Sequence, residues 1–141
     1  MAAGRELVAP AGLERWFGDA ACGLAVFDAA HRFVRVNPAM ARIDGVPVDD
    51  HAGRELHDVL PGLAERIEPL LRRVLDGGET IAGMELVGRT RAEPDRDRRF
   101  ATAWSPLRAE DGAVQGVGAT LLPLSDGDEA TLELRVREER M

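Results

Sequence analysis

Residues 33–45 read FVRVNPAMARIDG, and the periodicity of this stretch changes at Asn37. Residues 33–36 have the aromatic and β-branched composition of a strand. Asn37 and Pro38 then favour the start of a helix, because the Asn side chain can accept a hydrogen bond from a free backbone N–H and Pro suits the first helical position. Gly45 suits the position just past a helix end. The stretch therefore predicts a helix of about two turns directly after a short strand.

Apolar periodicity elsewhere in the chain predicts further helices and strands in a definite order. The predicted helices lie at 12–21, 53–60 and 63–76, and the predicted strands lie at 24–28, 80–89, 98–107 and 113–124. The first of these strands turns back onto 33–36 and forms a hairpin with it. Strands grouped at both ends with helices between them indicate an α+β fold: one antiparallel sheet with helices on one face, plus the amphipathic helix near the N-terminus.

Two local features interrupt this periodicity. Pro69 lies inside the longest helical pattern, and we expect it to kink that helix or to split it into two pieces. Residues 90–97, TRAEPDRD, are highly charged and are predicted to form a loop between two strands. The Asp111-Gly112 pair predicts a tight hairpin turn between the last two strands.

The composition bounds the class of protein. The chain has 141 residues, a net charge of −7 and no Lys, so its acidic surface argues against nucleic acid or a membrane as the main partner. No apolar run approaches the ~18 residues of a membrane span, and the first residues lack the features of a signal peptide. We therefore expect a cytoplasmic protein. The single Cys22 excludes an internal disulfide and a cysteine-based metal cluster.

Four stretches in this order resemble a PAS domain, a small sensory α+β fold of bacterial signalling proteins. They read GLAVFDAAHRFVRVNPAMARIDG (23–45), AGRELHDVLPG (52–62), LLRRVLDGGETI (70–81) and WSPLRAEDGAVQGVGAT (104–120). The resemblance covers residues 13–124 and implies a five-stranded antiparallel sheet under short helices that can enclose a pocket. His31 departs from it, since the family often has Gly in this first turn.

The resemblance also implies a division of the chain. Residues 1–21 form an N-terminal segment with the amphipathic helix, residues 22–124 form the PAS domain, and residues 125–141 form a charged tail or a linker to an output domain.

Members of this family bind different cofactors, and the residues that such cofactors need are missing here. The light-sensing flavin subclass requires a reactive Cys in a short helix, but the corresponding stretch 51–60 (HAGRELHDVL) has none. Haem-binding members ligate iron through a His on the long helix, and 63–76 contains no His. We predict neither cofactor, and interpret Cys22 as a small buried or interfacial residue.

The histidines are interpreted as structural. His57 is predicted to lie at the surface or at a cap, and His31 in a turn. His51 follows Asp49 and Asp50, which allows a metal site, although a solvated acidic loop is the simpler interpretation. We predict no metal site.

Catalytic signatures are also missing. Ser105 and Ser125 do not lie in a nucleophile elbow, and Asp28, Glu85 and Asp111 are isolated carboxylates rather than an acid–base pair. We expect the protein not to be an enzyme.

Large apolar side chains from the helices and strands could line a ligand pocket between the two layers. In the strand 98–107, alternation places Phe100 and Trp104 toward the helices and the intervening alanines on the other face. The candidate pocket residues are Met40, Ile43, Leu56, Leu60, Leu71, Met84, Leu86, Phe100 and Trp104. The same side chains would also suit a sealed core, so an occupiable cavity and a filled core both remain open.

These observations predict a non-catalytic sensor or regulatory domain that relays the binding of a small apolar ligand, or a conformational state, to an output domain. Family analogy suggests a kinase, phosphatase or cyclase, in the same chain or in a partner chain. The alternative is a ligand-free PAS domain that serves only to assemble homodimers. In either case we predict a homodimer held by Leu13, Trp16 and Phe17, which form an apolar stripe on the N-terminal helix.

Overall fold

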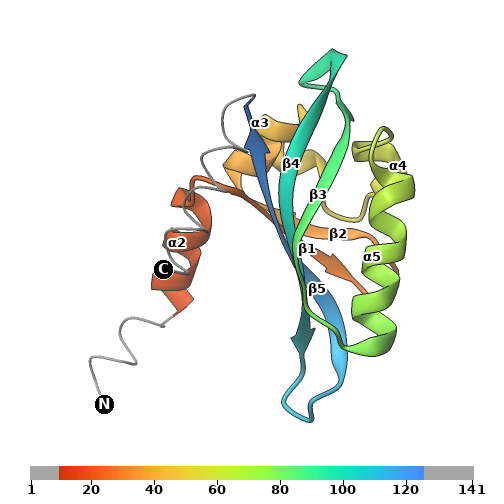
Figure 1. Ribbon diagram of the computed structural model, residues 1–141. Helices are drawn as coiled ribbons and strands as arrows, with labels where there is room; N and C mark the ends of the chain where they lie inside the picture. The colour runs from red at the N-terminus through yellow and green to blue at the C-terminus, as the bar shows by residue number, and fades with distance from the viewer. Residues whose placement is uncertain (1–9, 126–141) are drawn as a thin grey trace, which may run out of the picture.

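The computed structural model describes residues 10–125 of the chain (Figure 1). Its helices are α2 (Pro10–Asp19), α3 (Pro38–Asp44), the 3₁₀ helix η1 (Val48–Asp50), α4 (Leu56–Val59) and α5 (Ala64–Gly77). Its strands are β1 (Gly23–Asp28), β2 (Phe33–Val36), β3 (Ile81–Thr90), β4 (Glu93–Arg108) and β5 (Val114–Leu124). Apart from Ser125, the predicted tail at 125–141 lies outside the described residues, as do residues 1–9.

The five strands form one antiparallel sheet in the order β2-β1-β5-β4-β3. The first and last strands, β1 and β5, are therefore neighbours near the middle of the sheet. Helices α3, α4 and α5 bury side chains in one hydrophobic cluster against the inner face of the sheet. Helix α2 lies on the other side of the sheet from α5 (Figure 1). The predicted α+β fold, with helices on one face and an additional N-terminal helix, is confirmed.

The helix predicted from the opening stretch is present with the expected caps. Asn37 is the N-cap residue of α3, and its side-chain oxygen accepts a hydrogen bond from Met40 N. Gly45 ends the helix in the left-handed region at φ 80°, and its N–H donates to Ala41 O. A Cβ atom at Gly45 would also come within 2.5 Å of Ala92 N, so the close approach of the β3–β4 turn adds a second requirement for Gly here.

Helix α5 runs from Ala64 to Gly77 as one element, so the predicted split at Pro69 is wrong. Pro69 lies on the exposed side of the helix. The carbonyl group that loses its partner at this proline belongs to Glu65, which is also exposed, so water can take the missing hydrogen bond. None of the helices among residues 10–125 has the length and apolar character required to cross a bilayer.

The prediction of a charged loop at 90–97 is also wrong, because β4 begins at Glu93. This part of β4 pairs only with β3 and continues the hairpin past the end of β5, whose last pairing partner is Arg99. Charges lie across the two strands, with Arg99 Nε 2.5 Å from Glu85 Oε1 and Arg89 Nε 3.4 Å from Asp97 Oδ1. The high charge therefore belongs to a solvated hairpin.

Candidate functional site

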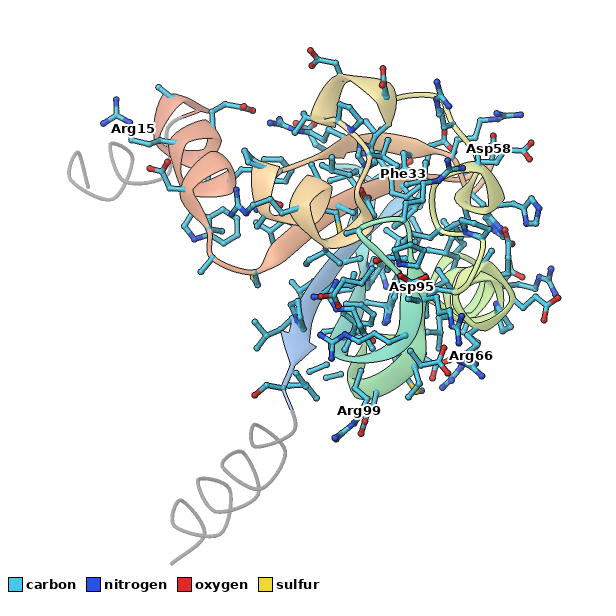
Figure 2. The ribbon with its side chains drawn as sticks, turned by 90° about the horizontal axis from the view of Figure 1, so that it is seen from above. Arg15, Phe33, Asp58, Arg66, Asp95 and Arg99 are labelled. Atoms are coloured by element: carbon cyan, nitrogen blue, oxygen red, sulfur yellow. The ribbon has the colours of Figure 1, made fainter. Side chains whose placement is uncertain are left out.

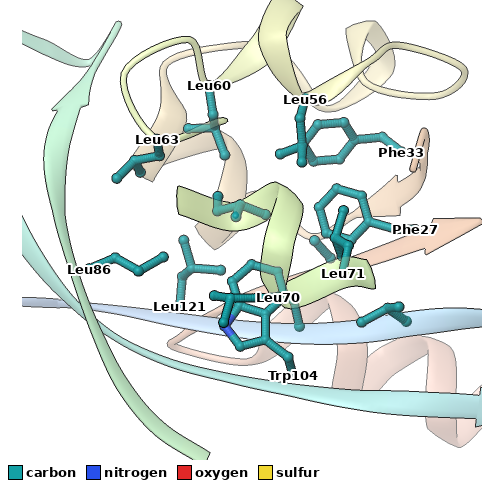
Figure 3. Close-up of a cluster of buried hydrophobic side chains, with 14 of the residues drawn as sticks. Phe27, Phe33, Leu56, Leu60, Leu63, Leu70, Leu71, Leu86, Trp104 and Leu121 are labelled. Carbon is teal, nitrogen blue, oxygen red and sulfur yellow. The ribbon is translucent and has the colours of Figure 1, made fainter. Parts of the chain in front are cut away.

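The nine candidate pocket residues lie together in the core between the helices and the inner face of the sheet. Eight of them are buried members of one hydrophobic cluster, and Met84 is partly buried against it. Figure 3 shows Leu56, Leu60 and Leu71 facing Phe27, Leu86 and Trp104 across this layer. The sequence-based grouping of these side chains is correct, and their assignment to a ligand pocket stays a prediction.

A buried hydrogen-bond chain joins the centre of this core to the edge of the sheet. Trp104 Nε1 donates to Thr102 Oγ1 at 2.9 Å, and the Thr102 hydroxyl donates to Met84 O at 2.7 Å. Both side chains are buried, whereas Ala101 and Ala103 on the other face are half-exposed. The alternation predicted for this strand is confirmed, and the indole N–H has the partner that a buried Trp needs.

Asn37 connects the helical layer to α2. Its side-chain oxygen accepts hydrogen bonds from Leu24 N and Met40 N, each at 2.9 Å. Its Nδ2 group donates to Phe17 O at 3.0 Å and to Cys22 O at 3.1 Å. The side chain is fully buried, and each of these hydrogen bonds has a backbone group as its partner. Asn37 therefore joins the end of α2, the start of β1 and the first turn of α3.

A second set of contacts holds α2 against β2. The Arg35 guanidinium donates two hydrogen bonds to Glu14, at 2.5 and 2.8 Å, and lies 4.1 Å above the centre of the Phe17 ring. The hydrogen bonds from Arg35 lower the pKa of the Glu14 carboxyl group. Phe17 is half-buried by this arrangement, so it contributes to the attachment of α2 within the chain.

The other two residues of the predicted stripe remain in solvent. Leu13 is 51% exposed and Trp16 is 61% exposed. Figure 2 shows α2 at the side of the molecule, with Arg15 pointing away from it. Of the three predicted interface residues, Phe17 packs against Arg35 within the chain. Leu13 and Trp16 stay mostly exposed to solvent.

An apolar groove continues from α2 across the outer face of the sheet. Its walls are Trp16 and Phe17 on one side and residues of β1, β4 and β5 on the other, including Val26, Leu107 and Thr120. A neighbouring hollow on the same face is lined by Cys22, Ala101 and Leu122 among others. Leu107 and Leu122 are among the exposed large hydrophobic residues. The outer face is thus apolar and open next to α2.

The three histidines differ sharply in their surroundings. His57 is exposed, as predicted, and His31 occupies its turn with φ 65° while its Nδ1 lies 2.7 Å from Glu68 Oε2. The solvated loop predicted around His51 is wrong, because His51 is fully buried and its Nε2 lies 2.6 Å from Asp44 Oδ2. His51 is the C-cap residue of η1, and its backbone N–H donates to Val48 O. Within residues 10–125, no group of three or more His, Cys, Asp or Glu residues could hold a metal ion.

Asp44, Glu14 and Arg35 carry important polar contacts here and are absent from the sequence-based predictions. Asp44 offered one signal, because a carboxylate in the last turn of a helix is unfavourable beside the negative end of the helix dipole. Such a position suggests a compensating partner. The pairing of Glu14 with Arg35 has no comparable signal, since the two residues are far apart in the sequence.

Solved structures of other proteins share this fold. VqmA of Vibrio cholerae, solved in a complex with a ligand and DNA, is 20% identical with a TM-score of 0.68 over 81% of this chain and 50% of that chain. The PAS domain of Bordetella pertussis BvgS is 19% identical with a TM-score of 0.68, over 92% of this chain and 96% of that one. A sensor histidine kinase structure from Vibrio cholerae is 11% identical with a TM-score of 0.59, over 89% and 99%.

The predicted exclusion of nucleic acid from the partners is wrong. VqmA is a DNA-binding receptor with a domain of this same fold, and this chain spans about half the length of the VqmA chains it matches. The charge of one domain therefore does not decide what the rest of such a protein binds.

The sequence itself identifies the family. No protein with a curated description matches the chain. The family model of the PAS fold matches residues 17–129, which include every strand of the sheet and all of the helices that cover its inner face. This chain belongs to the PAS family.

Proposed function

We propose that this chain is a non-catalytic, cytoplasmic regulatory PAS domain of a bacterial signalling protein, which works as a homodimer and relays a small ligand or a conformational state to an output domain. The main support for a dimer is the exposed apolar surface formed by α2 and the adjoining outer face of the sheet. Leu13, Trp16, Leu107 and Leu122 are all exposed there. Aromatic side chains at such a surface supply much of the binding energy of protein interfaces.

The arrangement of α2 supports a role in signal relay. Its backbone is tied through Asn37 to α3 and β1, and its side chains are tied through Arg35 to β2. A change in the helical layer that moves α3 therefore acts on the same side chain that holds the end of α2. In a dimer built on α2, such a movement would alter the interface.

The output domain is proposed from similarity. Family analogy suggests a kinase, a phosphatase or a cyclase, and VqmA adds a DNA-binding domain to these possibilities. The ligand-bound VqmA structure supports a small molecule as the signal. The core residues around Trp104 are the place where such a ligand would bind.

Replacing Trp16 with Glu tests the dimer. We expect the native chain to be a dimer in sedimentation equilibrium, and Trp16→Glu to raise its dissociation constant by at least about tenfold, because an interface Trp is replaced by a charge. Val48→Glu is the matched control, since Val48 is an exposed apolar residue on η1 in the helical layer and its replacement should leave the dimer intact.

A native chain that stays monomeric at high micromolar concentration would contradict the proposed homodimer. Equal dimerisation of the native chain and Trp16→Glu would instead exclude α2 from the interface.

Native mass spectrometry of the freshly purified protein separates the sensor from the simple assembly module. A sensor with an occupied core should retain a small molecule and show a mass above that of the bare dimer. A bare dimer that also fails to bind members of a small-molecule library would favour the assembly module.

A further inference from the structure

Asp44 and His51 form a polar pair inside an otherwise apolar layer. Both side chains are fully buried, and the Phe33 ring packs against the imidazole in a T-shaped arrangement, with the ring centres 5.3 Å apart. Neither residue belongs to the candidate pocket or to the surface of α2. The pair closes the segment from Gly45 to His51, which we call the η1 segment.

The hydrogen-bond partners of His51 define how many protons the pair holds. Nδ1 faces the carbonyl oxygens of Pro47 and Val48 at 2.8 and 3.3 Å, and carbonyl groups can only accept, so Nδ1 carries a proton. Nε2 faces the Asp44 carboxylate at 2.6 Å, which requires a second proton between these two atoms. Asp44 Oδ1 is already used, since it accepts from Val46 N at 2.9 Å.

Loss of the second proton leaves the site without a satisfactory arrangement. If the remaining proton stays on Nδ1, the lone pair of Nε2 faces a carboxylate oxygen. If it moves to Nε2, the lone pair of Nδ1 faces two carbonyl oxygens. In both cases acceptors face each other in a buried site, where water cannot compensate.

The η1 segment has little else to hold it against the core. Pro47, Val48, Asp49 and Asp50 are exposed, and only the half-buried side chain of Val46 packs against the hydrophobic cluster. The chain after His51 is anchored separately, because Gly53 N donates to Phe33 O and Phe33 N donates to Arg54 O. The imidazole of His51 is thus the main interior anchor of the segment.

We propose that the His51–Asp44 pair is a proton-dependent latch, which holds the η1 segment closed while the second proton is present and releases it when that proton leaves. The charged group that contacts the imidazole is Asp44 of α3. Asp49 and Asp50 of η1, and Arg54 and Glu55 beyond it, are exposed to solvent, and the β2 contact is the uncharged Phe33. The latch would let the domain respond to a rise in pH.

The direction of the effect follows from the folded and unfolded states. Burial alone lowers the pKa of His51, while the hydrogen bond and charge of Asp44 and the carbonyls of Pro47 and Val48 raise it, and the pKa lies above its ordinary value of 6.5. The stabilisation is therefore complete below pH 6.5 and is lost as the pH rises through the folded-state pKa. Between pH 6.5 and the folded-state pKa of His51, the folding equilibrium constant should fall by up to about tenfold per pH unit.

NMR titration of the His51 ring nitrogens between about pH 5 and about pH 9 tests the latch. We expect His51 to be doubly protonated at the acidic end and to lose its second proton only above its ordinary pKa of 6.5. The amide signals of Val46, Asp50 and His51 should change with the same midpoint.

Asp44→Asn is the informative variant. An Asn side chain can donate to Nε2 of a neutral imidazole, so the latch stays closed with a single ring proton. We expect the titration of His51 and the linked amide changes to disappear from the range, and stability to depend less on pH than in the native chain. His57→Gln is the matched control and should keep all native behaviour.

A His51 ring that stays neutral throughout, or one that titrates without moving these amides, would overturn the proposal. Persistence of the linked amide transition in Asp44→Asn would do the same. The titration of the native chain decides the matter even if Asp44→Asn fails to fold.

Discussion

Trp104→Ala is expected to lower the free energy of unfolding by about 3–5 kcal/mol, the range found when large aromatic side chains are removed from a core. The indole is fully buried and packs with Phe27 at a ring-centre distance of 6.3 Å. Its removal also takes away the donor that Thr102 accepts from. The shift of the midpoint in urea, at unchanged slope, measures the effect.

Trp104→Phe separates the two contributions. It keeps an aromatic ring in the core and loses only the N–H donor and part of the volume, so we expect a loss of about 1–2 kcal/mol. The location of Trp104 can be checked independently in a Trp16→Phe background, where its emission should be blue-shifted and resist quenching by iodide. A red-shifted, readily quenched emission would contradict the burial on which the prediction depends.

Asn37→Ala is expected to cost about 3–4 kcal/mol, which is several times the ~1 kcal/mol of an ordinary N-cap. The variant leaves the N–H groups of Leu24 and Met40, and the carbonyls of Phe17 and Cys22, without their side-chain partner. The site is buried, so these backbone groups lose hydrogen bonds that water does not fully replace. Urea unfolding again gives the measurement.

Asn37→Ser is the matched control for this position. A Ser hydroxyl can still cap α3 but is too short, and has too few donors, to reach both carbonyls near α2. It should recover about 1 kcal/mol relative to Asn37→Ala. If Asn37→Ala costs only about as much as a lost cap, the connection from Asn37 to α2 contributes nothing to stability.

Much of this fold could be predicted from the sequence because the decisive signals are local. Asn37, Pro38 and Gly45 set the two ends of α3 by their own backbone preferences and short-range hydrogen bonds. The period of two in β4 separated Trp104 from the alanines beside it. The start of β4 could not be predicted, because Glu93 and its charged neighbours become a strand through pairing with β3, a contact that local polarity does not reveal.

The candidate site divides in the same way. Hydrophobic residues at helical or strand spacing had to meet in one core, so their grouping was predictable. The burial of His51 was not, since it depends on a turn that brings the ring back to Asp44. The attachment of α2 also depends on tertiary contacts, and a helical stripe cannot show that Phe17 turns inward while Trp16 remains in water.

The central position of β1 and β5 has a consequence for how such a domain sits in a longer polypeptide. Gly23 at the start of β1 is paired with Leu121, and β5 continues for three more residues to Leu124, so the chain enters and leaves the sheet at the same end, roughly 10 Å apart. When the domain is part of a longer polypeptide, the segment that precedes it and the segment that follows it can therefore stay near each other. A preceding segment and a following segment begin at the same end of the sheet, and a small twist of this one strand pair would change the angle at which they diverge.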